Sequence, residues 1–284
     1  QDIVPQLATL VQDQSTDAIG LNPAAIHALW TMQGLGAMNG SNEAASKAGL
    51  AALTHPSAGV RRAAVMVLPR DEATLTALLE SQLISDKDAQ VRMATLLAIA
   101  ESPSTESAVK AIWKAIQEPH NASDRWIPDA AAAAAAKNDT AFIKAMLTST
   151  DSDKLDLDGS LGDIVNVVTT HYAGRGATDS IVATLTSLKA AAPKSATAVL
   201  DGLMEGWPAD SAPALSDAEK QQLEAVMDAL PENVRDRLLT LGTRWKVPGL
   251  FTGRMEAIVA TLEKPVADPA ASDGARAAAA SRWI

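Results

Sequence analysis

Few residues of this chain have the type and spacing that catalysis requires. Ser107 and Lys110 form a Ser-x-x-Lys motif, in which acyl-transfer enzymes place a lysine one helical turn from a nucleophilic serine. The companion motifs Ser-Asp-Asn and Lys-Thr-Gly are missing from the sequence, as is a Gly-x-Ser-x-Gly elbow. We therefore interpret the motif as part of a helix surface, and we predict that the chain has no catalytic residue and is not an enzyme.

An acidic stretch, Asp151 to Gly159, has the residue types of a calcium loop. An EF-hand loop needs Asp at its first position, Gly at its sixth and Glu at its twelfth. With Gly159 sixth, the first position is Lys154 and the twelfth is Val165, so both end ligands are missing. We interpret the stretch as a solvated loop, although the sequence leaves open whether it binds a cation in another geometry.

The sequence contains few groups that bind metals or cofactors. It has no cysteine, which excludes disulfides, cysteine–zinc sites, iron–sulfur ligation and covalent haem attachment. Its four histidines are His27, His55, His120 and His171. No two of them stand four residues apart, the spacing that puts two zinc ligands on one helix face. We predict no metal site and no cofactor, since a zinc site assembled across repeats has no support.

The stretch GLGAMNG, Gly34 to Gly40, begins like a dinucleotide-binding loop. Gly34 and Gly36 have the right spacing, but Asn39 stands where the third glycine belongs, and a helical pattern precedes them. Phosphate binding at such a loop needs a strand, a tight turn and then a helix N-terminus. The stretch instead predicts the end of a helix followed by a turn.

The overall composition limits the classes of partner. The chain has 284 residues and a formal net charge of −10, with 47% hydrophobic and 3% aromatic residues. A nucleic-acid binder needs a basic surface, and so does a protein that binds anionic membranes, so we expect neither partner. No run of 18 apolar residues occurs, so we expect no membrane span. We expect a protein partner, while a small-molecule or glycan ligand stays open.

Apolar residues recur at helical spacing along nearly the whole chain. The fold class that we predict is all-α, because no stretch alternates convincingly as a strand and alanine, the best helix former, is abundant. The predicted helices cover residues 2–11, 22–38, 42–53, 59–68, 71–83, 89–100, 104–116, 127–136, 139–149, 163–173, 178–192, 195–207, 216–230, 232–245, 249–263 and 272–284. The seven alanines from Ala130 to Ala136 predict a helix pressed closely against its neighbours.

The helices come in pairs, and the pairs repeat. Val91-Arg92 stands 31 residues after Val60-Arg61, and a polar turn precedes both. This interval is typical of two-helix repeats, whose apolar faces are buried only when neighbours stack. A third unit has Ile127 in the valine position but lacks the arginine. We expect regular repeats over residues 1–150 and less regular ones over 151–284, continuing the same stack past the polar stretch 148–162.

These residues resemble the second helix of a HEAT repeat. Asp86, Val91 and Arg92 carry the whole pattern, whereas Val60 and Arg61 have His55 in place of the aspartate. The resemblance implies an α-solenoid of stacked antiparallel helix pairs, in which Asp and Arg bridge successive repeats. At His55 it implies either a broken ladder or a special contact.

A more particular resemblance covers most of the chain, through HALWTMQGLGAM, HPSAGVRRAAVMVLP, DAQVRMATLLAIAE, DRWIPDAAAAAAA, LDGLMEGW, RLLTLGTRW and ARAAAASRWI. These segments resemble the helical part of large exported bacterial proteins, in which a sugar-dehydrogenase-like β-propeller comes first and a c-type cytochrome domain ends the chain. The resemblance implies a periplasmic or extracellular protein with those domains as partners. Because the chain begins at Gln1 without Met, we expect it to be a processed or excised piece of such a protein.

Tryptophan is the most frequent aromatic residue, at positions 30, 113, 126, 207, 245 and 283. We expect most of these rings to fill gaps between alanine-rich helices. Trp207, before a proline-rich loop, and then Trp126 are the candidates for exposed anchors of a partner. His55, at the junction between two repeats, is a further candidate for an interaction.

Three functions remain open from the sequence. The first is a non-catalytic interaction and scaffold module. The second is an accessory domain of a sugar dehydrogenase–cytochrome electron-transfer protein, shaping the access of substrate or redox partner. The third is a module that binds a small molecule or glycan. A deep pocket lined by Trp and His would favour the third, whereas a flat apolar patch would favour the first two.

The missing cysteines generate a first prediction. Covalent c-type haem needs Cys-x-x-Cys-His, so the purified chain is expected to show no Soret band. It is also expected to reduce no redox dye in the presence of sugars. An absorbance scan and a dye-reduction assay measure these properties, and a Soret band or dye reduction by the pure chain would contradict the interpretation.

Overall fold

The computed structural model describes residues 3–254, 272 and 274. Every regular element in this part of the chain is an α- or 3₁₀-helix, so the predicted all-α class is confirmed. None of the described helices has both the length and the apolar character that crossing a lipid bilayer requires. The helices predicted over 249–263 and 272–284 lie largely outside the described residues, and Trp283 lies wholly outside them.

The α-helices follow the predicted pattern closely. They are α1 (Val4–Gln12), α2 (Pro23–Gly34), α3 (Glu43–Ala51), α4 (Ala58–Val67), α5 (Glu72–Glu80), α6 (Ala89–Glu101), α7 (Glu106–Ile116), α8 (Pro119–Ala122), α9 (Ile127–Lys137), α10 (Asp139–Leu147), α11 (Ser160–Gly174), α12 (Ile181–Ser187), α13 (Pro193–Gly206), α14 (Asp217–Ala229) and α15 (Glu232–Trp245).

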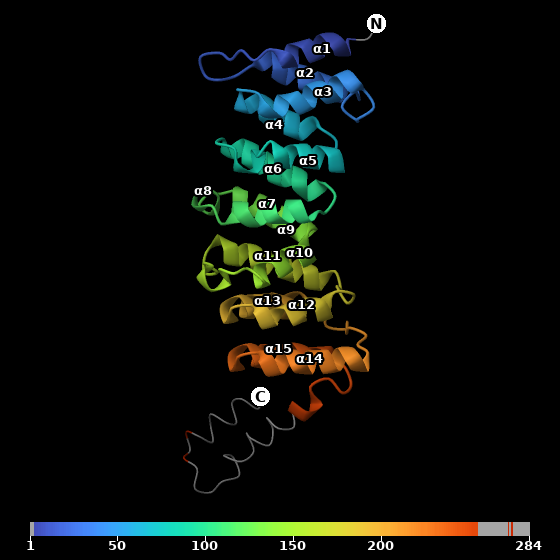
Figure 1. Ribbon diagram of the computed structural model, residues 1–284, viewed down its shortest axis with the longest axis vertical. Coiled ribbons are helices and arrows are strands. Elements are labelled where there is room, and N and C mark those ends of the chain that lie inside the picture. Colours follow the sequence, from blue (N-terminus) through green and yellow to red (C-terminus); the bar gives the residue numbers. More distant parts are fainter. Residues whose placement is uncertain (1–2, 255–271, 273, 275–284) are drawn as a thin grey trace.

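The helices stack in two layers. In the layer that we call the second, α2, α4, α6, α9, α11, α13 and α15 contact one another in that order. In the first layer α1 packs on α3, and α5, α7, α10, α12 and α14 form a second run of neighbours. Figure 1 shows the result as an elongated column with α1 at one end and the α14–α15 pair at the other. Each pair therefore buries its apolar face mainly against the pairs beside it.

Local sequence signals set where many of these helices begin. The Asn22 side chain accepts the Ala25 amide at 2.9 Å, and Pro23 occupies the first helical position of α2. Asn42 caps α3 and Asp71 caps α5 in the same way. Ser216 and the glutamate three residues later form a capping box at the start of α14. These caps satisfy amides that would otherwise lack partners.

The turn predicted after α2 is present. The helix ends at Gly34, and Gly36 and Gly40 have φ of 72° and 89°, in the left-handed region that glycine adopts without strain. Here Asn39 Oδ1 accepts the amide of Ser41 at 2.9 Å, which closes the loop. GLGAMNG is thus a helix end and turn.

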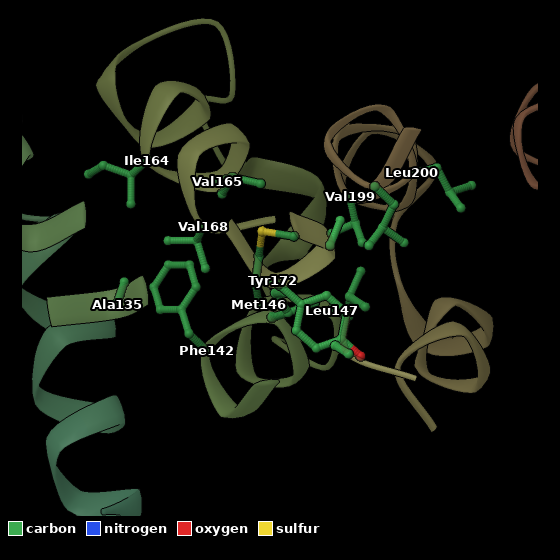
Figure 2. Packing of buried hydrophobic residues seen from close by; sticks show 14 of the residues in the cluster. Ala135, Phe142, Met146, Leu147, Ile164, Val165, Val168, Tyr172, Val199 and Leu200 are labelled. Carbon is green, nitrogen blue, oxygen red and sulfur yellow. The ribbon is translucent and has the colours of Figure 1, made fainter. Parts of the chain in front are cut away.

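The alanine-rich helix α9 lies between α6 and α11. Of its alanine run, Ala131, Ala134 and Ala135 are at most 1% exposed. Small side chains let the neighbouring backbones approach, as the run predicted. Figure 2 shows Ala135 in one cluster with Phe142 of α10 and Val168 of α11. Larger apolar residues on those helices thus fill the space that the alanines leave.

The hydrophobic core continues past the acidic stretch. Leu147 and Leu161, on either side of it, belong to one cluster of buried residues that reaches from Leu75 to Phe251. A second cluster, from Val4 to Ala98, overlaps it along the chain. The division at residue 150 into more and less regular repeats stays a prediction.

Two glycines allow the closest approach between helices in the second layer. A Cβ atom at Gly202 of α13 would stand 2.7 Å from Thr169 Cβ of α11. One at Gly206 would stand 2.7 Å from the backbone Cα of Thr170. Real Cβ atoms do not approach this closely, so α13 depends on glycine at both positions.

Gly206→Ala is therefore expected to force α13 away from α11 and to lower the free energy of unfolding by about 1–3 kcal/mol. Gly34→Ala is the matched control, because Gly34 also ends a second-layer helix and its Cβ would meet nothing within 4 Å. The control is expected to be neutral or to stabilise by up to about 1 kcal/mol. Urea denaturation followed by circular dichroism measures both, and equal effects would contradict the close-approach argument.

Candidate docking groove

The predicted repeat signature forms a buried polar connection between successive helix pairs. Val60 and Val91 are fully buried at the start of α4 and α6. Arg61 donates from Nε to Asp86 Oδ2 at 2.7 Å and from Nη2 to Asp86 Oδ1 at 2.8 Å. Both side chains are less than a tenth exposed. This bidentate pair joins the α3–α4 pair of helices to the α5–α6 pair.

His55 makes a special contact rather than breaking the series. Its Nδ1 accepts the Ser57 amide at 3.0 Å, so in the neutral ring Nε2 carries the hydrogen and donates it to the Asp13 carbonyl at 2.8 Å. Arg61 Nη1 donates to the His55 carbonyl at 2.8 Å. With 1% exposure, His55 is closed to a partner, which corrects the expectation of a surface interaction there.

At the junction that follows Arg92, an asparagine accepts the hydrogen bond that an aspartate accepts from Arg61. Arg92 donates from Nη1 to the Asp86 carbonyl and from Nε to Asn121 Oδ1, at 2.8 and 2.7 Å. Asn121 in turn donates to the Ala115 carbonyl at the end of α7. We call the connected set Asp13, His55, Arg61, Asp86, Arg92 and Asn121 the polar ladder. It runs from the α1–α2 loop to the α7–α9 connection.

The ladder carboxylate has a perturbed acidity. Burial raises the pKa of Asp86, but hydrogen bonds from Arg61 and from the Asp88 amide, with the Arg61 charge, outweigh burial and hold that pKa below its ordinary value. A carboxyl with a lowered pKa in the folded state stabilises the fold above its unfolded pKa, about 3.9. This contribution is lost as the pH falls through the lowered value.

The two predicted tryptophan anchors differ in exposure. Trp207 is only 1% exposed, so the expectation that it is exposed is wrong. Its ring packs at 5.0 Å between centroids on Trp245, and its Nε1 donates to the Ser211 carbonyl because the loop after α13 folds back over it. Trp126 is 55% exposed at the start of α9, with the Arg125 guanidinium over its ring. No other exposed large apolar side chain accompanies Trp126 on α9.

A groove of 530 Å³ lies across α2, α4 and α6 of the second layer. Trp30, Met66 and Leu97, one from each helix, line it and are 43%, 47% and 44% exposed. We call these three side chains the apolar row. The small residues Gly59 and Ala63 of α4 also line the groove, and Ile26 of α2 packs closely against Gly59.

Sequence reasoning missed this groove, although a signal for it exists. Met66 stands six residues after Val60, and Leu97 stands six residues after Val91. A residue six positions after a buried one, about 600° around a helix, lies roughly 120° from it and so outside the buried stripe. Large apolar residues at this same outward position in successive repeats predict an exposed apolar row.

The charges of the groove belong to Arg62, Arg70 and Glu101. Arg70 donates to Glu101 Oε2 at 2.9 Å and to the Val65 and Leu68 carbonyls at 2.9 and 2.7 Å. These bonds hold Arg70 against the C-terminus of α4. A smaller recess of 340 Å³, next to the groove, shares Met66, Arg70 and Glu101 with it.

The remaining residues with possible chemistry lie apart. Ser107 is exposed on α7, and its neighbour Lys110 pairs with Glu106 at 2.6 Å. In the acidic stretch Lys154 pairs with Asp151, and Lys194 pairs with Asp158. Across the described residues, no three His, Asp or Glu side chains come together as metal ligands would.

Comparison with protein families and with curated proteins found no relative: no family model matches the chain, and no curated protein matches it. The groove is therefore interpreted through its own geometry.

The ladder generates a prediction about stability. Asp86→Ala leaves the Arg61 guanidinium buried without its carboxylate, and is expected to lower the free energy of unfolding by about 3 kcal/mol. Glu101→Ala is the matched control: Glu101 also accepts from an arginine Nε, but it is 66% exposed, so less than about 1 kcal/mol is expected. Urea denaturation measures both losses.

The acidity of Asp86 adds a second readout of the same change. Because the pKa is lowered on folding, the stability difference between the wild type and Asp86→Ala is expected to shrink as the pH falls below about 4. A loss no larger than that of the control, or a difference that stays constant into strong acid, would contradict the role of the pair.

Proposed function

We propose that this chain is a non-catalytic interaction and scaffold module of the HEAT-like α-solenoid class, and that it binds a protein partner in the α2–α4–α6 groove. The observation that carries the proposal is the apolar row. Three successive helices each expose one large apolar side chain into one groove. Soluble proteins seldom expose such residues side by side without a binding role.

The assignment to the HEAT class is supported by the ladder. Val60-Arg61 and Val91-Arg92 have equivalent surroundings, with each valine buried and each arginine bonded to the carbonyl six residues before it. The Arg61–Asp86 pair then joins two successive units. In a stack of this kind the extended face of one layer is the natural binding surface.

The residue types of the groove favour a protein over a small molecule. Tryptophan, methionine and arginine are enriched in protein interfaces, and tryptophan and arginine dominate their binding energy. Small-molecule sites bury most of their ligand, whereas each side chain of the apolar row is more than two-fifths exposed. Of the tryptophan and histidine lining that would favour a glycan or small-molecule site, the groove has Trp30 but no histidine.

The exported setting is a second part of the proposal and rests on the sequence resemblance alone. A propeller or cytochrome domain of the same polypeptide would then be the partner, and the location would be the periplasm or the cell exterior. In that setting the chain would act as an accessory domain that shapes the access of substrate or redox partner.

Peptide selection tests the groove. Random helical peptides are displayed and selected on the immobilised full chain, and the enriched peptides are titrated against variants by fluorescence anisotropy. Trp30→Ala is expected to weaken binding about tenfold or more, as for a central interface tryptophan. Trp126→Ala is the matched control, since it removes another exposed tryptophan far along the stack. The proposal would be refuted if none of the enriched peptides depended on Trp30 for binding.

A further inference from the structure

The kind of ligand that fits the groove follows from Arg62, the charged side chain of the groove that has no ion-pair partner in the described part of the chain. Arg70 is held by three bonds and neutralised by Glu101. Arg62 is exposed, and its hydrogen bond is a long one, from Nη1 to Gln90 Oε1 at 3.4 Å. No carboxylate in the described part of the chain lies within ion-pair distance of Arg62.

The position of Arg62 is set by its neighbour in the sequence. Arg61 turns inward to the ladder, and successive residues of a helix point about 100° apart. Arg62 therefore faces outward, one turn before Met66 on the same face of α4. Ile26 of α2 and Met93 of α6 line the same groove, so Arg62 borders it together with apolar side chains of three helices.

We propose that the groove binds one amphipathic helical peptide that carries a carboxylate beside its apolar face. This inference rests on the proposed function and names its partner. The apolar face packs on the row of Trp30, Met66 and Leu97, and the carboxylate pairs with Arg62. A helix presents apolar side chains at i, i+3, i+4 and i+7 along one face, and such a face can lie across α2, α4 and α6 and contact all three anchors.

Charge complementarity selects an acidic partner over a basic one. The whole chain has a net charge of −10, yet the groove is lined by two arginines and one glutamate. Because apolar surface excludes water from this site on binding, a basic side chain next to Arg62 would be repelled more strongly than in open solvent. An acidic side chain there would pair with the Arg62 guanidinium, which has no carboxylate partner among the described residues.

The test uses the full chain and two pools of the same random helical peptide library. One pool is selected on the wild type and the other on Arg62→Glu. The wild-type pool is expected to be enriched in Asp and Glu next to the apolar stripe, and the Arg62→Glu pool in Lys and Arg. A peptide from the wild-type pool is expected to bind Arg62→Glu about fivefold more weakly, with the difference shrinking at high salt.

Lys87→Glu is the matched control, because it reverses the charge of a cation outside the groove. It is expected to leave both the selected composition and the affinity unchanged. Pools of equal composition, or peptides that bind Arg62→Glu as tightly as wild type, would overturn the assignment of an acidic helix. If those peptides still required Trp30, the groove's proposed function would stand.

A second copy of the chain is the competing occupant. Sedimentation of the wild type and of Trp30→Ala over a wide concentration range distinguishes it. The wild type is expected to remain monomeric, leaving the groove open to peptides. A dimer that dissociates in Trp30→Ala would overturn the inference, because the chain itself would then cover the apolar row.

Discussion

The buried contact between Arg61 and Asp86 is the constraint on which the arrangement of the first half of the stack depends. A column of helix pairs has no closed core, since each pair contacts mainly its neighbours. Contacts among alanines and valines tolerate small shifts between helices, because the hydrophobic effect has no direction. A bidentate arginine–carboxylate pair does have direction, and shifting it would leave two buried charges unpaired.

The ladder extends this constraint through chemically different groups. His55 takes the aspartate position and reaches the Asp13 carbonyl, while Asn121 takes it at the following junction. At each junction an arginine or a histidine forms a hydrogen bond with a polar atom of the neighbouring helix pair. Within the polar ladder the geometry is thus kept although only the junction of Arg61 and Asp86 has the full Asp–Arg pair.

The groove follows from the same register. Anchoring Arg61 inward turns Arg62 and Met66 outward, where they meet Trp30 from the pair before and Leu97 from the pair after. The apolar row exists only because Trp30, Met66 and Leu97 lie at matching positions along three neighbouring helices. Buried and exposed side chains therefore alternate within one short segment, with Arg61 in the polar ladder and Arg62 on the wall of the proposed docking groove.

The sequence by itself determined the helices and the inward direction of Val60 and Val91, because these depend on periodicity. Through the HEAT resemblance it implied that Asp and Arg join successive units, but it did not identify Arg61 and Asp86 as the pair. Only the tertiary structure decided that His55 keeps the ladder intact, that Trp207 is buried on Trp245, and that Trp30 joins Met66 and Leu97 in a groove. These features join residues of different helix pairs. Their geometry is set by the distance between the pairs and by the shift of one pair relative to the next along the helix axes. A local sequence pattern contains neither quantity.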